Sequence, residues 1–429
     1  MQRASDRRLE VLLTSEDSGE GCNAALWDPS NGSRLSIFKN GGTLSRRTLQ
    51  LLNDCYLLGA DHTKNRIHVW PLNNPSPLNN IRLTAPGRVS ALTCTPNGTY
   101  MIAAVADTLY IWQVCNGRLV GTLNRHLQTI KCLSVTKDGS LFASAGEDGL
   151  VFVWSLYSAL NDKRCSPVHK FSDHTQPVGD VYFGHGGTRG RLYTASLDRT
   201  VNVYEMGSGV RLVSIVFPVP LTVIAVNITD SELFVGCVTG DILQCNLHEP
   251  PRGIEQHVRA SDDDAGRNAV YRAHKSEITA LSVSVDCRTL VSGSTDKAVH
   301  IWDIVSRLVL RTIEHKGSVT AAFLAPAFEN FFATTLKPSL ELRNLQQTAS
   351  DDSSRCVIEV INRSWNPKEF LDFKSFMDEE PGEPGISEDT DAKQNMAAEY
   401  EKLKQINKNL FQYAVANTLR KANGRQAGD

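Results

Sequence analysis

The chain has 429 residues, of which 41% are hydrophobic, 21% charged and 7% aromatic, a composition that excludes collagen-like, coiled-coil and fully disordered chains. Its 45 basic and 47 acidic residues give a formal net charge of −2, so the chain lacks the overall positive charge typical of nucleic-acid-binding proteins. The first residues do not resemble a secretory signal, and no apolar stretch is long enough to span a bilayer. We therefore expect a soluble intracellular protein.

Ten cysteines are spread between Cys22 and Cys356 without any C-x-x-C motif, and most of them lie in apolar runs. A free cysteine in such a run behaves as a small buried hydrophobe. The spacing predicts neither a zinc site nor a disulfide framework. No nucleotide-binding loop is present either, so we expect no metal and no cofactor.

Short apolar runs that end in an aromatic residue recur along the chain. Trp27, Trp70, Trp112 and Trp154 follow one another at intervals of 43, 42 and 42 residues, and later runs end at Tyr204, Cys245 and Trp302. A period near 40 to 45 residues with four short strands per repeat is typical of β-propellers of WD repeats. Solenoids of similar period need long amphipathic helices, which residues 1–371 hardly contain.

One repeat shows the strand pattern clearly. Residues 88–123 contain four β-rich runs, RVSALTCTP, TYMIAAV, LYIWQV and RLVGTL, which are separated by turn residues such as Pro96, Gly98 and Gly117. These four runs are predicted to form one blade.

Three repeats share a second set of polar residues at nearly constant spacing. The sets are His126, Ser144, Asp148 and Trp154; His174, Thr194, Asp198 and Tyr204; and His274, Ser292, Asp296 and Trp302. In WD repeats these residue types form a hydrogen-bonded chain inside a blade, which satisfies a buried imidazole and a buried carboxylate together. A hydrolytic triad uses similar residue types but occurs at one exposed site, whereas this set recurs at three. We interpret the sets as structural, and no catalytic residue is predicted.

The chain ends decide how the ring closes. Six repeats look complete, residues 9–38 resemble the second to fourth strands of a blade, and residues 318–324 resemble the missing first strand. Joining them would remove exposed sheet edges and gives an all-β, seven-bladed propeller. Residues 330–345 also continue the repeat, however, so an eight-bladed ring stays open as an alternative.

Two segments depart from the regular repeat. Residues 247–268 contain Pro250, Pro251 and an acidic run, and we expect a projecting mobile loop, either a tolerated insertion or a partner-binding loop. Residues 184–190, GHGGTRG, match no phosphate-binding motif and are interpreted as a wide turn.

The composition changes after about residue 371. Residues 372–395 hold eight acidic and two basic residues and are predicted to be a disordered linker. Residues 396–421 contain neither Pro nor Gly and are predicted to form an amphipathic helix. Its apolar stripe consists of Met396, Leu403, Ile406, Leu410 and Tyr413. So short a helix needs a partner surface, which could be the same helix of a second chain, a groove of another protein or its own propeller.

The order of propeller, acidic linker and terminal helix resembles the WD repeat-containing protein 18 family. The resemblance covers nearly the whole chain and includes ITALSVSVD at residues 278–286 and QINKNLF at residues 405–411. It implies a non-enzymatic scaffold subunit of a nuclear and nucleolar complex that matures the large ribosomal subunit precursor and supports removal of the second internal transcribed spacer.

The resemblance also implies partners: a large helical-repeat scaffold protein, a further helical-repeat subunit and, indirectly, an AAA-type remodelling ATPase and the precursor particle. It implies self-association through the terminal helix and a link to replication-origin licensing. The propeller by itself equally fits another WD-repeat adaptor, such as a ubiquitin-ligase substrate receptor or a signalling scaffold. An enzyme is the least favoured reading, because no metal set, nucleotide loop or single activated nucleophile is present.

Overall fold

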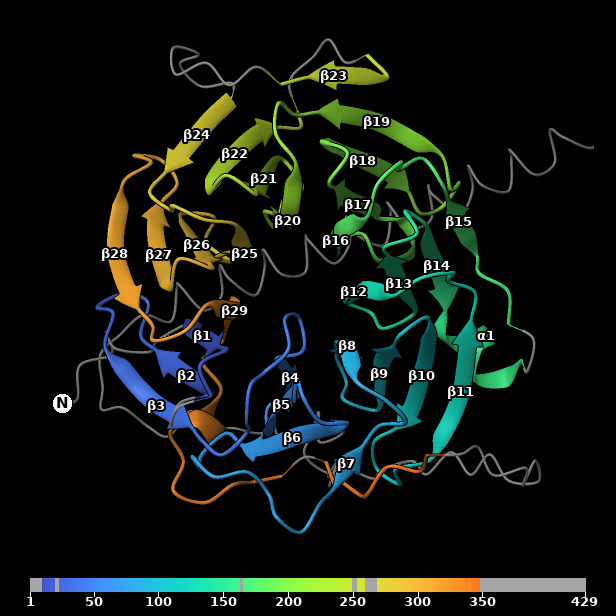
Figure 1. The fold of residues 1–429 in the computed structure, drawn as a ribbon, viewed down its shortest axis with the longest axis vertical. Helices are drawn as coiled ribbons and strands as arrows, with labels where there is room; N and C mark the ends of the chain where they lie inside the picture. Colours follow the sequence, from blue (N-terminus) through green and yellow to red (C-terminus); the bar gives the residue numbers. More distant parts are fainter. Residues whose placement is uncertain are drawn as a thin grey trace, which may run out of the picture. The chain divides into compact units, whose positions relative to one another are not determined.

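Seven antiparallel sheets are arranged around a common axis in the part of the chain that the computed structural model describes, as Figure 1 shows. The described residues are 10–19, 23–162, 165–248, 253–258, 268–338 and 340–347. Each sheet is one blade of a β-propeller, with its first strand next to the axis. The predicted seven-bladed, all-β fold is therefore confirmed.

We number the blades along the chain from the first complete one. Blade 1 contains β4 (Gln50–Leu52), β5 (Tyr56–Ala60), β6 (Arg66–Pro71) and β7 (Leu83–Thr84). Blade 2 contains β8 (Val89–Cys94), β9 (Tyr100–Val105), β10 (Thr108–Gln113) and β11 (Leu119–Asn124). Blade 3 contains β12 (Ile130–Val135), β13 (Leu141–Gly146), β14 (Val151–Ser155) and β15 (His169–Phe171), with helix α1 (Leu156–Asn161) before its last strand.

The remaining blades follow the same order. Blade 4 contains β16 (Val178–Phe183), β17 (Arg191–Ser196), β18 (Thr200–Glu205) and β19 (Arg211–Val216). Blade 5 contains β20 (Leu221–Val226), β21 (Glu232–Cys237), β22 (Asp241–Asn246) and β24 (Asn268–Arg272). Blade 6 contains β25 (Ile278–Val283), β26 (Thr289–Ser294), β27 (Ala298–Asp303) and β28 (Val309–Glu314). Blade 7 contains β29 (Val319–Pro326), β1 (Glu10–Glu16), β2 (Ala24–Trp27) and β3 (Arg34–Phe38).

The core lies between neighbouring blades, where the third-strand aromatic residues pack. Trp154 of blade 3 is fully buried in a cluster with Ile102 and Ile111 of blade 2, and Trp112 of blade 2 packs with Leu58 of blade 1. A large aromatic ring therefore anchors each of these blades to the one before it.

Blade 7 closes the ring with strands from both ends of the described chain. β1 lies between β29 and β2, and Leu12 on β1 faces Leu324 on β29 in the antiparallel register. Figure 1 shows blue β1 beside orange β29. Because β1 pairs on both sides, the two ends of the described chain are joined in one sheet at the seam.

The repeat pattern extends into residues 330–345, but their described part, 330–338 and 340–345, contains no strand. The chain makes a single 3-10 turn, η2 (Glu329–Phe331), and then runs past blade 1 toward blade 2, as the orange segment in Figure 1 shows. Leu340 is buried against blades 1 and 2, and the indole of Trp112 donates a hydrogen bond to the Gln346 carbonyl at 2.8 Å. The apolar residues of this segment cover existing blades, so the eight-bladed alternative is wrong.

The described part of the 247–268 insertion differs from the projecting mobile loop that the sequence predicts, and residues 249–252 and 259–267 lie outside the described residues. Its residues Glu255–His257 form β23, which pairs in parallel with β19 and extends blade 4 to five strands. The insertion therefore covers the outer edge of the preceding blade.

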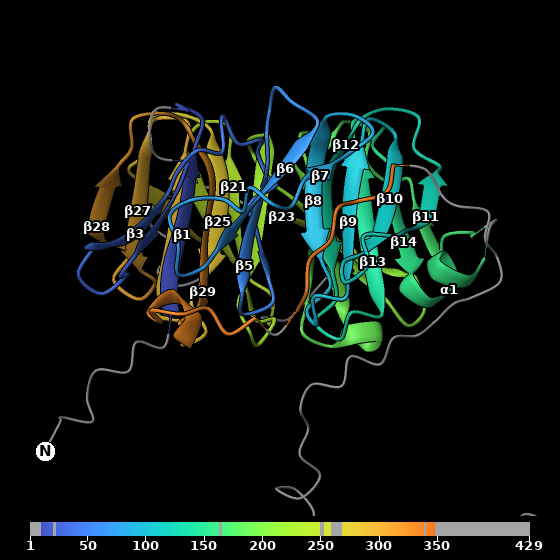
Figure 2. The same ribbon diagram turned by 90° about the horizontal axis from the view of Figure 1, so that it is seen from below.

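The GHGGTRG turn at residues 184–190 connects β16 to β17 and contains the 3-10 turn η1 (Gly187–Arg189). Figure 2 shows the blades from the side.

Among the described residues, no helix is long and apolar enough to cross a membrane. The predicted acidic linker, 372–395, and the predicted terminal helix, 396–421, lie outside the described residues.

Candidate functional site

The first polar set lies inside blade 3 as one continuous chain of hydrogen bonds. His126 Nδ1 lies 3.0 Å from the Asp148 carboxylate and its Nε2 lies 2.9 Å from Ser144 Oγ, which accepts a hydrogen bond from the Trp154 indole at 3.0 Å. A carboxylate can only accept, so Nδ1 carries the proton and Ser144 donates to Nε2. Since the His126 side chain is only 1% exposed, a substrate could not reach it.

The second complete set lies in blade 6. His274 is 2.9 Å from Asp296 and 2.7 Å from Ser292, and Ser292 accepts a hydrogen bond from the Trp302 indole at 2.8 Å. Asp296 also accepts a hydrogen bond from the Lys275 backbone N–H at 3.0 Å. The Asp296 carboxylate therefore holds both the His274 imidazole and the loop before β25.

The blade 4 set differs from the prediction at its aromatic residue. His174 bonds Asp198 at 2.9 Å and Thr194 at 2.8 Å, but the Tyr204 hydroxyl donates to Asp173 at 2.8 Å and not to Thr194. The phenol hydroxyl lies at the far end of the ring, beyond the position of an indole N–H, and this longer reach takes it to Asp173 instead.

Burial and hydrogen bonding shift the pKa values of these groups in opposite ways. Burial alone would raise the pKa of Asp198, but hydrogen bonds from His174 and Thr200 outweigh it and lower the pKa to about 2. Burial lowers the pKa of His126 and His274, and their aspartates only partly oppose this effect. Burial thus favours the neutral imidazole at His126 and His274.

A related set in blade 7 was missed by the sequence analysis. The Trp27 indole donates to Thr14 at 2.8 Å, and His315 Nδ1 lies 3.5 Å from Glu16, which also accepts the backbone N–H of Lys316 at 2.8 Å. The sequence does contain a signal for this set, because His315 stands four residues before the first strand of its blade, as His126 does. Glu16 replaces the usual aspartate, and the set links β1 and β2 to the chain entering β29.

The inner strands share a local irregularity that shapes the axis of the ring. In six of the described inner strands the register shifts at the second residue, which places one bulged residue per blade at the same level. These residues are Ser90, Lys131, Gly179, Thr222, Thr279 and Thr320, and all of them line one cavity. A β-bulge changes the direction in which a side chain points. These six residues form the wall of the cavity around the axis of the ring, which we call the channel mouth.

Hydroxyl groups of the ring join neighbouring blades. The Thr222 hydroxyl contacts the Gly236 carbonyl in its own blade at 3.1 Å and the Ile278 carbonyl of blade 6 at 2.7 Å. Thr279 makes the equivalent contacts to Gly293 and Val319, at 3.2 and 2.7 Å. These hydroxyls are already hydrogen-bonded and carry no charge. The charge of the mouth therefore comes from other residues.

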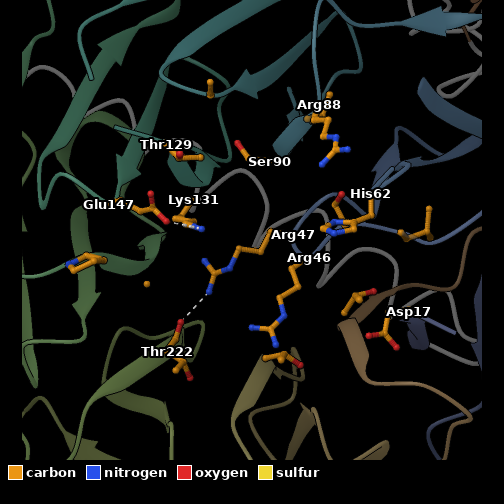
Figure 3. Close-up of a pocket in the computed structure, with 18 of the residues that line it drawn as sticks. Asp17, Arg46, Arg47, His62, Arg88, Ser90, Thr129, Lys131, Glu147 and Thr222 are labelled. Atoms are coloured by element: carbon orange, nitrogen blue, oxygen red, sulfur yellow. Dashed lines mark hydrogen bonds and ion pairs between the residues drawn. The ribbon is translucent and has the colours of Figure 1, made fainter. Parts of the chain in front are cut away.

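Two adjacent arginines enter the mouth from the loop before β4, as Figure 3 shows. Arg47 forms an ion pair with Asp180 of blade 4 and donates to the Thr222 carbonyl of blade 5 at 2.9 Å. Its backbone is in the left-handed region, with φ of 58°. Burial would lower the pKa of Arg47, but the Asp180 carboxylate outweighs this effect and raises it.

The rim of the mouth carries further charged groups. Arg46 pairs with Glu277 of blade 6 at 3.1 Å, and Lys131 pairs with Glu147 at 2.8 Å. Arg88 is exposed and forms no ion pair with any residue that the structure describes. The cavity has a volume of about 1110 Å³ and is lined by charged residues from several blades, Asp17, Arg46, Arg47, Arg88, Lys131, Glu147 and Glu277.

This charged site was not predicted, because its members are far apart in the chain. The adjacent pair Arg46–Arg47 was the only local signal.

The predicted association residues Met396, Leu403, Ile406, Leu410 and Tyr413 lie outside the described residues. Within the described ranges no group of three potential ligands, His, Cys, Asp or Glu, could hold a metal ion.

Comparison with known proteins places this geometry in a family. The model of the WD domain, G-beta repeat, matches residues 117–155, 165–205 and 267–303, which overlap blades 3, 4 and 6. WD repeat-containing protein 18 of Mus musculus is 37% identical over 337 residues, covering 78% of this chain and 77% of the relative. This chain belongs to the WD repeat-containing protein 18 family.

Two further relatives show how far the similarity extends. WD repeat-containing protein 18 of Danio rerio is 36% identical over the same shares of the two chains, 78% and 77%. Pre-rRNA-processing protein IPI3 of Yarrowia lipolytica is 32% identical and covers 71% of this chain and 72% of its own. This chain thus shares extended similarity with a fungal protein whose name assigns it to pre-rRNA processing.

Proposed function

We propose that this chain is a non-enzymatic scaffold subunit of a nuclear complex that processes pre-rRNA and supports assembly of the large ribosomal subunit. The observation that carries this proposal is the similarity, over more than two thirds of both chains, to the Yarrowia lipolytica pre-rRNA-processing protein. The step assigned to the complex is removal of the second internal transcribed spacer, in the nucleolus and nucleoplasm.

The fold supports a scaffold role in physical terms. Each blade contributes loops to both faces of a ring whose seam is closed by paired strands, so loops from distant parts of the sequence are held at fixed relative positions. The His–Asp sets are buried inside blades and are bonded to hydroxyls and backbone groups. They therefore serve blade rigidity, and the proposed activity is binding rather than turnover.

The proposed partners are a large helical-repeat scaffold protein and a further helical-repeat subunit of the same complex. The AAA-type remodelling ATPase and the precursor large subunit are contacted indirectly. Residues 396–421 provide self-association through Met396, Leu403, Ile406, Leu410 and Tyr413. Light scattering on the full chain and on a Leu403→Asp, Leu410→Asp variant tests this point, since equal masses would reject self-association by the terminal segment.

Affinity purification from nuclear extract tests the function itself. The tagged full chain should co-purify large-subunit assembly factors together with RNA that hybridises to probes for the second internal transcribed spacer. Recovery of ubiquitin-ligase or signalling proteins without spacer RNA would contradict the proposal and favour another kind of WD-repeat adaptor.

A further inference from the structure

We propose that the channel mouth between the inner strands is a binding site for an acidic peptide segment of a partner protein. The site is the cavity of about 1110 Å³ walled by the bulged residues of the inner strands. Its cationic groups are Arg46, Arg88 and Lys131. This inference deepens the scaffold role and rests on it, because it names the chemistry of one partner segment.

The three cationic side chains come from three successive blades and line the same cavity. Arg46 precedes β4 and Arg88 directly precedes β8, while Lys131 is the bulged residue of β12. Figure 3 shows their side chains around the same space. Of the six bulged residues only Lys131 is charged, and the others are small or glycine. The basic groups are thus spread around the mouth, since the Arg46 side chain reaches Glu277 of blade 6, and the short side chains between them leave room for a ligand.

Two of these cations have partners that a ligand can replace. The side chains of Arg46 and Glu277 are 49% and 35% exposed, and those of Lys131 and Glu147 are 48% and 38% exposed. Exposed ion pairs contribute little to stability, because water and salt screen them. A carboxylate that arrives at the mouth can therefore pair with Arg88 directly and exchange with Glu277 and Glu147.

Below the rim, the site is closed by a fixed base. Arg47 is held by Asp180 and by the Thr222 carbonyl, so its guanidinium bridges blades 1, 4 and 5 and is not available to a ligand. The wall also contains two partly exposed apolar side chains, Val105 and Leu197. A peptide that combines carboxylates with apolar side chains fits both parts of this surface.

The same charges disfavour a nucleic acid. Single-stranded nucleic-acid sites combine a continuous basic groove with aromatic rings for base stacking. Here Asp17, Glu147 and Glu277 line the cavity beside the cations, and the described residues of its lining include no Phe, Tyr or Trp. A peptide with a few separated carboxylates is compatible with this mixture of charges. A nucleic acid, which carries one negative charge per nucleotide, is not.

Peptide display with the purified full chain tests the site. Peptides selected from a random library should be enriched in Asp and Glu, and a selected fluorescein-labelled peptide should bind more weakly as salt is added. Its counterpart with Asn and Gln in place of Asp and Glu should lose most of the affinity. The Arg88→Ala, Lys131→Ala double variant should bind the acidic peptide at least about tenfold more weakly, the effect of losing one charge-assisted contact.

The matched control is Arg288→Ala, which removes an exposed arginine from the β25–β26 loop, outside the cavity. It should bind the peptide as the wild type does, and all variants should keep the wild-type melting temperature. Selection without acidic enrichment, equal binding by the double variant, or tighter binding of an oligouridine competitor that depends on Arg88 would overturn the proposal. The assay uses purified protein, so it is separate from the spacer-RNA test: acidic-peptide binding without spacer RNA would contradict only the pre-rRNA role.

Discussion

Arg47 on the loop before β4 forms an ion pair with Asp180 on β16, and this pair joins blade 1 to blade 4 although 133 residues separate the two in the chain. Their side chains are 22% and 16% exposed. Arg46, the preceding residue, instead pairs with Glu277 of blade 6, where both groups are more exposed. Two adjacent arginines therefore differ in environment, and this difference can be measured.

Arg47→Met should lower the free energy of unfolding by about 2 to 3 kcal/mol, because it leaves a largely buried Asp180 carboxylate without its partner. Arg46→Met should change it by less than about 1 kcal/mol, as expected for an exposed pair. Urea unfolding of both variants gives the comparison. The Arg47→Met, Asp180→Asn double variant should lose less than the sum of the single changes, and equal effects of the two arginine substitutions would contradict this account.

Asp296→Ala should destabilise the propeller markedly, by about 2 to 4 kcal/mol, because His274 and two backbone N–H groups lose their acceptor. Glu314→Ala on β28 in the same blade is the control, since Glu314 is exposed, and it should leave the protein's stability unchanged. Thermal unfolding followed by circular dichroism distinguishes them. An unchanged melting temperature for Asp296→Ala would reject the structural role of the network.

His300 should make stability depend on pH. Burial, with His274 beside it at a ring distance of 4.3 Å, lowers the pKa of His300 from 6.5 to about 4. Between pH 6.5 and 4 this histidine is therefore protonated in the unfolded chain but not in the folded protein. The contribution of His300 to the free energy of unfolding is complete above pH 6.5 and is lost as the pH falls toward 4. The loss from this one group is at most about 3 kcal/mol.

The His300→Gln variant should flatten the stability profile between pH 6.5 and 4, and the exposed His62→Gln should not. Urea unfolding across this range measures the slope. A His300→Gln profile as steep as that of the wild type would mean that other groups cause the acid sensitivity.

Gly179→Ala should destabilise the protein by about 1 to 3 kcal/mol. A Cβ atom at this bulge would lie 2.8 Å from the Thr222 carbonyl oxygen and 3.2 Å from that of Leu221, both in the next blade. Gly207→Ala is the control, because its Cβ would meet no atom within 4 Å, and it should be neutral or slightly stabilising. Equal melting temperatures for the two variants would show that blades 4 and 5 are not packed as closely as the structure has them.

The repeat and the seam could be predicted from the sequence because their signals are local. The runs ending at Trp112 and Trp154 mark third strands, and the strand-like run at 318–324 pairs with β1 as the missing first strand. The strand-like pattern of residues 330–345 indicated an eighth blade that does not form, since an apolar run of strand length packs equally well as an irregular segment against blades 1 and 2.

The channel mouth could not be predicted for a different reason. No spacing in the chain relates Arg47 to Asp180 or Arg46 to Glu277, and these pairs meet only because the ring returns distant blades to one axis. The Tyr204–Asp173 bond likewise depends on how far a phenol reaches, which the residue pattern does not encode.

Depletion and rescue test the central claim, a role in pre-rRNA processing, most directly. Cells depleted of this protein should accumulate precursors that contain the second internal transcribed spacer, seen by northern hybridisation, and should lose mature large subunits on sucrose gradients. Re-expression of the wild-type chain should restore both. Normal spacer removal and normal large-subunit levels after depletion would contradict the account.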